Sequence, residues 1–117
     1  LNNGRAYVTY MKKVAANLKK YNCKMYYLSV NPVNSAMIKS VGGKARSEAQ
    51  IASFNRTIYK NLCSGKNKSF TYINSCTNLQ MKGWISNRHD MGIYDGLHYS
   101  NATYLRIFDY CMRYLNR

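Results

Sequence analysis

The feature that most constrains the fold of this chain is an alternation of helical and extended patterns. Residues 5–21 place apolar side chains every three or four positions and lysines on the opposite arc, which predicts an amphipathic helix. An apolar, β-rich run at residues 25–30 follows, and its closing Asn-Pro pair cannot continue a strand ladder. A second helical stripe then leads to a short strand around residues 70–73. Such alternation predicts an α/β domain with parallel strands and crossover helices.

Short polar motifs mark where the predicted helices begin and end. The sequence SEAQ at residues 47–50 matches a capping box and predicts the start of the second helix, and a Ser-Gly pair at residues 64–65 predicts its end. Asn2 or Asn3 is the expected cap of the first helix. Ser100 is the expected cap of a terminal helix.

The same periodicity predicts which face of each helix packs against the core. The expected inward stripes are Tyr7, Met11, Val14, Leu18 and Tyr21 in the first helix, Ile51, Phe54, Ile58 and Leu62 in the second, and Tyr104, Phe108, Cys111 and Leu115, with Leu105 and Met112 alongside, in the last. Residues 34–46 and 76–98 show no sustained pattern and are predicted to be irregular. Loops as long as the second of these segments tend to be functional in compact domains.

Two strands are too few for a parallel sheet, which is normally covered on both faces and has several strands. The sequence opens at LNNGRAY without a methionine, which agrees with a processed or excised piece. We therefore expect the 117 residues to form the C-terminal portion of one larger domain. Residues outside this sequence, or another chain, would complete the sheet.

The formal net charge of +14 invites a nucleic-acid interpretation, because clustered Lys and Arg side chains bind phosphates. The 18 basic residues are instead scattered along the chain and form no tail of like charges. A cationic surface that attracts anionic polymers or acidic substrates nonspecifically is therefore favoured over a nucleic-acid partner. No apolar run approaches the roughly 20 residues that a membrane-spanning helix needs, so no membrane partner is expected.

The sequence Asp95-Gly96-Leu97-His98 places a carboxylate and an imidazole on one turn ahead of the terminal helix. At this spacing Asp95 can accept a hydrogen bond from His98 Nδ1–H, which would fix the ring tautomer and leave Nε2 as a general base. Such a base could deprotonate a serine hydroxyl brought from elsewhere in the fold. On spacing alone the simpler alternative is favoured, in which Asp95 caps a turn and His98 is a half-buried histidine near a helix start.

The cysteines show none of the C-x-x-C spacing that zinc ribbons and redox motifs need. Their even number fits disulfides in an exported protein and fits free buried thiols as well. The four are Cys23, Cys63, Cys76 and Cys111. A second His-Asp pair, at residues 89–90, has a spacing to the Asp-x-x-His turn that matches no metal template. We expect neither a metal nor a cofactor.

The string DGLHYS, followed by NATYLRIFDYCMRYL, resembles the last conserved block of the SGNH (GDSL-type) hydrolases, where an Asp-x-x-His turn precedes the final helix. MYYLSVNPVN is similar to the fourth strand and following loop of that family, IASFNRTIYKNL to the next helix, and SFTYINS to the fifth strand. The resemblance covers essentially the whole chain, and DGLHYS is its motif-specific part. It implies a three-layer, flavodoxin-like α/β fold, with Asp95 and His98 as the acid and base of a Ser-His-Asp triad.

The chain departs from the family pattern because it has no Gly-Asp-Ser block, so the nucleophilic serine has no matching position. The glycine of the second block and the Gly-x-Asn-Asp of the third, which would help to build the oxyanion hole, are also absent. LNNGRAYVTYMKK is similar to the segment that directly follows Gly-x-Asn-Asp. The resemblance therefore implies a chain that begins just past the oxyanion asparagine and is inactive by itself.

Three further residues are candidate substrate contacts. Asn31 and Asn34 follow a predicted strand at its carboxyl end, where α/β folds place their sites, and loop hydrogen bonding is the alternative role. Trp84 precedes the Asp-x-x-His turn on the long loop and could line a substrate cleft, with packing across the sheet edge as the alternative.

The expected function is that of a serine esterase, with small acyl esters or acylated carbohydrate as substrates and carbohydrate O-deacetylation as one possible reaction. Asp95 and His98 belong to this chain, whereas the nucleophile and most oxyanion donors would come from the N-terminal portion of the same fold. The alternative is a noncatalytic basic module that binds a wall polymer or nucleic acid. The expected location is secreted or at the cell surface.

Overall fold

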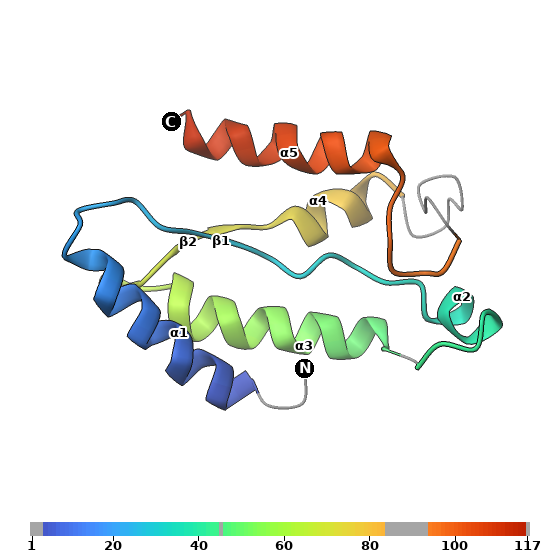
Figure 1. Cartoon of the computed structure of the whole chain (residues 1–117), viewed down its shortest axis with the longest axis horizontal. Coiled ribbons are helices and arrows are strands. Elements are labelled where there is room, and N and C mark those ends of the chain that lie inside the picture. The colour runs from blue at the N-terminus through green and yellow to red at the C-terminus, as the bar shows by residue number, and fades with distance from the viewer. Residues whose placement is uncertain (1–3, 45, 84–93, 117) are drawn as a thin grey trace.

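A computed structural model describes residues 4–44, 46–83 and 94–116 of the chain. Helices dominate this part of the protein, and two short strands lie between them (Figure 1). The elements in chain order are α1 (Gly4–Lys19), β1 (Tyr26–Leu28), α2 (Ser35–Ser40), α3 (Glu48–Ile58), the π-helical turn η1 (Tyr59–Cys63), β2 (Thr71–Ile73), α4 (Ser75–Met81) and α5 (Asn101–Leu115).

The two strands pair in parallel, as the alternation of patterns predicts. Tyr27 of β1 lies opposite Tyr72 of β2, and the chain between the strands contains α3, which serves as the crossover helix. In Figure 1 α1 and α3 lie on one side of the strand pair and α5 lies on the other. The α/β class with parallel strands is therefore confirmed, and helices cover both sides of the sheet.

The caps predicted for α3 and α5 are present. The Gln50 backbone N–H donates to Ser47 Oγ at 3.1 Å, and the Ser47 N–H donates to Gln50 Oε1 at 3.0 Å, which completes the capping box. Ser100 Oγ accepts from the Thr103 N–H at 3.2 Å. Each cap satisfies backbone donors that the first helical turn leaves without a partner. The Asn2 or Asn3 cap expected for the first helix lies outside the described residues.

The largest core cluster lies between α1, α3 and β1, as the stripe of α3 predicts. Ile58 and Leu62 are both 0% exposed, and the cluster also contains the rings of Phe54, Tyr27 and Phe70. Helical backbone continues from α3 through η1 to Cys63, directly ahead of the predicted Ser-Gly end. The list of inward α1 residues is only partly right, because Tyr7 and Met11 contact this cluster whereas Leu18 and Tyr21 are exposed.

Both segments predicted to be irregular contain a short helix, so that prediction is wrong for these residues. Asn34 Oδ1 accepts from the Met37 N–H at 3.1 Å and caps α2, and Asn74 Oδ1 accepts from the Thr77 N–H at 3.2 Å and caps α4. The helices have 6 and 7 residues, which is too short for a 3.6-residue periodicity to stand out in the sequence. The strands are also shorter than the apolar runs that predict them.

The inward face predicted for α5 is wrong in its main residues. Phe108 is 58% exposed, Leu105 64% and Leu115 50%, whereas the buried residues of the helix are Thr103 and Ile107. Most of the predicted stripe faces the surface. Cys111 packs partly against the cluster that contains Ile107, and the Tyr104 ring lies 5.6 Å from that of Tyr99 in the same cluster. The protein thus presents an exposed apolar face along α5. No helix in the described ranges is both long and apolar enough to cross a membrane.

Candidate active site

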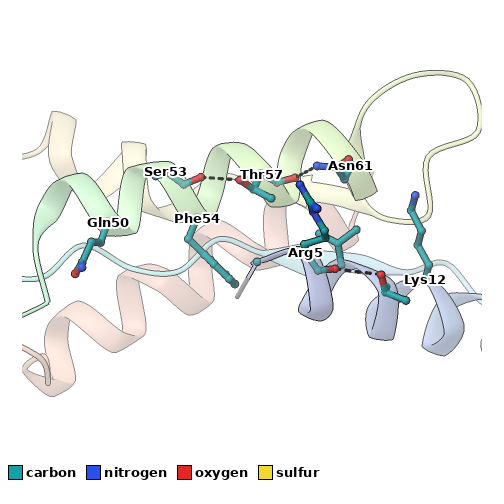
Figure 2. Close-up of a pocket in the computed structure, with 10 residues that line it drawn as sticks. Arg5, Lys12, Gln50, Ser53, Phe54, Thr57 and Asn61 are labelled. Atoms are coloured by element: carbon teal, nitrogen blue, oxygen red, sulfur yellow. Dashed lines mark hydrogen bonds between the residues drawn. The ribbon is translucent and has the colours of Figure 1, made fainter. Parts of the chain in front are cut away.

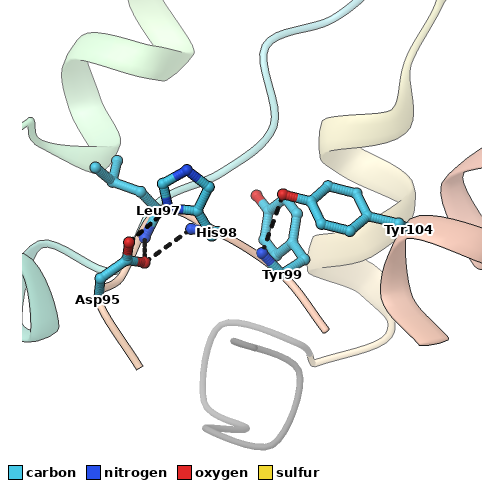
Figure 3. Close-up of polar contacts among 5 residues, drawn as sticks. All are labelled: Asp95, Leu97, His98, Tyr99 and Tyr104. Carbon is cyan, nitrogen blue, oxygen red and sulfur yellow. Dashed lines mark hydrogen bonds and ion pairs between the residues drawn. The ribbon is translucent and has the colours of Figure 1, made fainter. Parts of the chain in front are cut away.

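The Asp95–His98 turn forms the geometry predicted for an acid–base pair (Figure 3). Asp95 Oδ1 accepts hydrogen bonds from the backbone N–H groups of Leu97 and His98, both at 2.8 Å. Asp95 Oδ2 lies 2.5 Å from His98 Nδ1. One carboxylate therefore folds the turn with one oxygen and orients the imidazole with the other.

The electrostatics of the pair fix the tautomer of His98. Partial burial alone would raise the pKa of Asp95, but the hydrogen bonds from His98 and Leu97 outweigh it and lower that pKa to about 2. The carboxylate is then ionised at neutral pH and can only accept, so Nδ1 carries the proton. In the neutral ring Nε2 holds the free lone pair, which a general base requires.

The pair lies at the surface with its reactive nitrogen open. The side chain of His98 is 63% exposed and that of Asp95 20%. Within the described ranges, Nε2 has no hydrogen-bond partner and no serine hydroxyl bonds to the ring. Ser29 is 3% exposed and its Oγ accepts from the Cys76 N–H, while Ser35 Oγ donates to Glu48. The imidazole is therefore oriented and accessible, and these two serines, both engaged elsewhere, do not act on it.

Gly96 and Tyr99 attach the turn to the loop that follows β1. The Asn34 backbone N–H donates to Gly96 O at 3.0 Å, and the Tyr99 hydroxyl donates to Pro32 O. Burial raises the pKa of Tyr99, so the hydroxyl stays protonated and keeps donating. These contacts place His98 beyond the carboxyl end of a parallel strand, which is where α/β proteins carry their sites.

Asn31 and Asn34 are both engaged in hydrogen bonds that shape the loops. Asn31 Oδ1 accepts from the Ser75 hydroxyl at 3.0 Å, which connects the loop after β1 to the start of α4. Asn34 caps α2 with its side chain and holds Gly96 with its backbone. Asn34 thus contacts the candidate turn directly and Asn31 does not, and a substrate contact by either residue stays a prediction. Trp84 lies outside the described residues.

A second carboxylate supports the same loop, and the sequence patterns did not indicate it. Glu48 accepts from the Ser35 backbone N–H at 3.0 Å, and its other oxygen accepts from the Ser35 hydroxyl at 2.8 Å. Burial would raise the pKa of Glu48, but the hydrogen bonds from Ser35 lower it overall. The interaction joins the first turn of α2 to that of α3. The two residues lie 13 apart across a loop, so only tertiary structure reveals the contact.

All four cysteines lie within the described residues and are free thiols, which resolves the alternative that the sequence left open. Burial raises the pKa of Cys63 to about 11 and raises that of Cys76 and Cys111 as well. These thiols stay protonated at neutral pH and are poor nucleophiles. Across the described ranges no three His, Cys, Asp or Glu side chains gather as metal ligands. The His-Asp pair at residues 89–90 lies outside those ranges.

The lowered pKa of Asp95 predicts how the free energy of unfolding depends on pH. Because the folded value, about 2, is below the ordinary 3.8, the charged carboxylate stabilises the fold above pH 4, and this stabilisation is lost as the pH falls toward 2. We expect Asp95→Asn to lose about 1 kcal/mol of unfolding free energy at neutral pH and almost none near pH 2. Urea denaturation of both proteins from pH 7 to 2 measures this difference, and a constant difference would contradict the assignment.

The arrangement can orient an imidazole, accept a proton at Nε2 and stabilise the resulting imidazolium with Asp95. These are the tasks of the base and the acid of a hydrolytic triad. The geometry of Asp95 and His98 follows from the structure of this chain alone and needs no related protein for support. Comparisons of the chain with family models, with curated proteins and with solved structures find no match in any of the three.

Proposed function

We propose that this chain supplies the Asp–His part of the triad of an SGNH-type serine esterase. The observation that carries the proposal is the 2.5 Å contact between Asp95 Oδ2 and His98 Nδ1 on an exposed ring. A histidine that merely packs near a helix start has no need of an ionised partner or of an open Nε2. The buried and structural alternative for His98 is therefore less well supported than it is from spacing alone.

The proposed reaction follows the serine acyl-enzyme route. His98 Nε2 takes the proton of a serine hydroxyl as that oxygen attacks the ester carbonyl, and Asp95 stabilises the imidazolium. The imidazolium then protonates the leaving alcohol, and the acyl group remains on the serine. Water, deprotonated by the same nitrogen, attacks the acyl-enzyme; the ester bond to the serine breaks, the imidazolium returns the proton to the serine oxygen, and the acid is released. The substrates are small acyl esters or acylated carbohydrate, including O-acetyl sugars, at a secreted or cell-surface location.

The proposal includes a larger, three-layer flavodoxin-like fold of which this chain is the C-terminal portion. Two observations support it. Among the described residues β1 pairs with β2 alone, so one edge of β1 is open to a further strand. Leu28 of β1 is 40% exposed, and α5 exposes Leu105, Phe108 and Leu115. An N-terminal portion that adds strands beside β1 and covers these side chains would supply the serine and the oxyanion donors as well.

Hydrolysis of p-nitrophenyl acetate tests the function. We expect the protein that includes the residues encoded upstream of Leu1 to hydrolyse this ester, and the present chain alone to be inactive. The upstream reading frame should encode a Gly-Asp-Ser block. A frame without that block, together with no hydrolysis, would refute the esterase proposal and favour the noncatalytic alternative.

The noncatalytic alternative has one observation in its favour, which is the charge. Against a net charge of +14, none of the described Lys and Arg side chains forms an ion pair with a described carboxylate. Unpaired cations of this number attract anionic polymers. The alternative predicts binding of such a polymer without turnover of any ester.

A further inference from the structure

A cleft of about 740 Å³ lies between α1 and α3, in a part of the protein that the candidate active site does not use. Arg5 and Lys12 extend into it from α1 toward the helix that carries Ser53 and Thr57 (Figure 2). None of the residues of the Asp95–His98 turn lines this cleft. The cleft can therefore be considered as a site of its own.

The charge of the cleft has a single sign. Arg5 and Lys12 are seven residues apart on one helix, which places them on the same face and roughly 10 Å apart along the axis. They are the only charged residues that line the cleft among the described residues, and both are exposed. A concave surface with two cations and no carboxylate concentrates positive potential and selects anions.

The hydrogen-bonding groups of the cleft point to the rest of the ligand. The hydroxyls of Thr9 and Thr57 donate to the carbonyls of Arg5 and Ser53, both at 3.1 Å, and Asn61 Nδ2 donates to Thr57 O at 2.8 Å. Both hydroxyl donors are used within their own helices, so the oxygens of Thr9 and Thr57 remain as acceptors. Asn61 keeps its Oδ1 as an acceptor and its second N–H as a donor. A complementary ligand carries hydroxyl donors in addition to negative charge.

We propose that the cleft between α1 and α3 binds an anionic oligosaccharide. Its carboxylate groups pair with Arg5 and Lys12, and its hydroxyls donate to the threonine and asparagine oxygens along the cleft. The Phe54 ring, which also lines the cleft, supplies an apolar wall. A DNA backbone offers phosphates but no hydroxyl donors, so it complements only half of the surface. The site does not rest on the proposed esterase activity, although it would hold an acidic polymer near an enzyme that deacylates it.

Two double variants of α1 with the same change of charge test the proposal. Arg5→Gln/Lys12→Gln removes both cations of the cleft, whereas Lys13→Gln/Lys19→Gln removes two exposed cations of α1 that do not line it. The probe is hexagalacturonate, titrated calorimetrically into the full chain at low ionic strength, with neutral maltohexaose for comparison. We expect the first variant to bind about tenfold more weakly and the second to change less than twofold.

A bulky neutral side chain placed in the cleft tests the binding site independently of charge. Ser53→Trp fills it from the exposed face of α3, and Ala49→Trp places the same side chain on α3 outside the lining residues. Only Ser53→Trp should weaken hexagalacturonate binding, and circular dichroism checks that each variant is folded. Equal losses in both charge variants, equal binding of maltohexaose, or no binding at low salt would each overturn the proposal. Tighter binding of single-stranded RNA or duplex DNA, lost with Arg5→Gln/Lys12→Gln, would replace it with a nucleic-acid cleft.

Discussion

Replacing His98 with alanine lowers kcat/KM for p-nitrophenyl acetate about 10⁴-fold or more in the protein that carries the proposed serine; this is the largest effect that we expect. In the proposed acyl-enzyme route the imidazole performs both proton transfers, and no other side chain in the turn can take its place. Ester binding should change little, because the ring is expected to transfer protons and not to bind the substrate. The loss should therefore appear in kcat.

The chain offers a matched control for this variant. His89 is the other of its two histidines, and His89→Ala makes the same chemical change 9 positions earlier. We expect His89→Ala to keep kcat/KM within about twofold, because the proposed acyl-enzyme route assigns no step to His89. If His98→Ala keeps the wild-type kcat/KM, the triad assignment is wrong. If both variants lose activity equally, the effect does not come from the Asp95–His98 pair.

Gly96→Ala has the largest expected effect on the fold. Gly96 has φ +81, and a Cβ there would lie 2.5 Å from Asn34 O and 2.8 Å from both Ile38 N and Ile38 Cγ1. Backbone atoms cannot yield as the end of a flexible side chain can, so the turn or α2 must shift. We expect a loss of about 2–4 kcal/mol in unfolding free energy, measured by urea denaturation.

Gly65→Ala separates the two causes of that loss. Gly65 has nearly the same positive φ, +84, but its added Cβ would meet nothing within 4 Å. It should cost only the backbone term, about 1 kcal/mol. Equal losses at both glycines would show that the close approach of Gly96 to Asn34 and Ile38 contributes nothing. In the proposed esterase Gly96→Ala should also lower kcat, because it shifts the backbone between Asp95 and His98.

The sequence predicted those features whose determinants are local. The capping box of α3 needs only residues 47–50, and the Asp95–His98 contact needs only a four-residue turn. Both can therefore be predicted without a structure. The α/β class follows from the alternation of patterns, each of which is also local.

Features that depend on distant parts of the chain could not be predicted in this way. The inward face of α5 was misassigned because apolar residues surround much of that helix, and packing of Ile107 with Met37 of α2 and Leu79 of α4 selects the buried side. The hydrogen bond from the Tyr99 hydroxyl to Pro32 O spans 67 residues, so no local sequence pattern predicts it. The cleft between α1 and α3 is likewise a product of packing, and its two cations look like any other lysine or arginine on a solvated face.

Asn34 performs two tasks at once, because its side chain starts α2 while its backbone N–H holds the carbonyl of Gly96. Local opening of α2 would therefore break one of the two contacts that attach the Asp95–His98 turn to the loop after β1, the other being the Tyr99–Pro32 hydrogen bond. A helix of 6 residues has little stability of its own and depends on its anchors, one of which is Glu48 on α3. The fraction of molecules in which the imidazole is correctly oriented should thus depend on the population of folded α2, a helix at residues 35–40 far from His98 in the sequence.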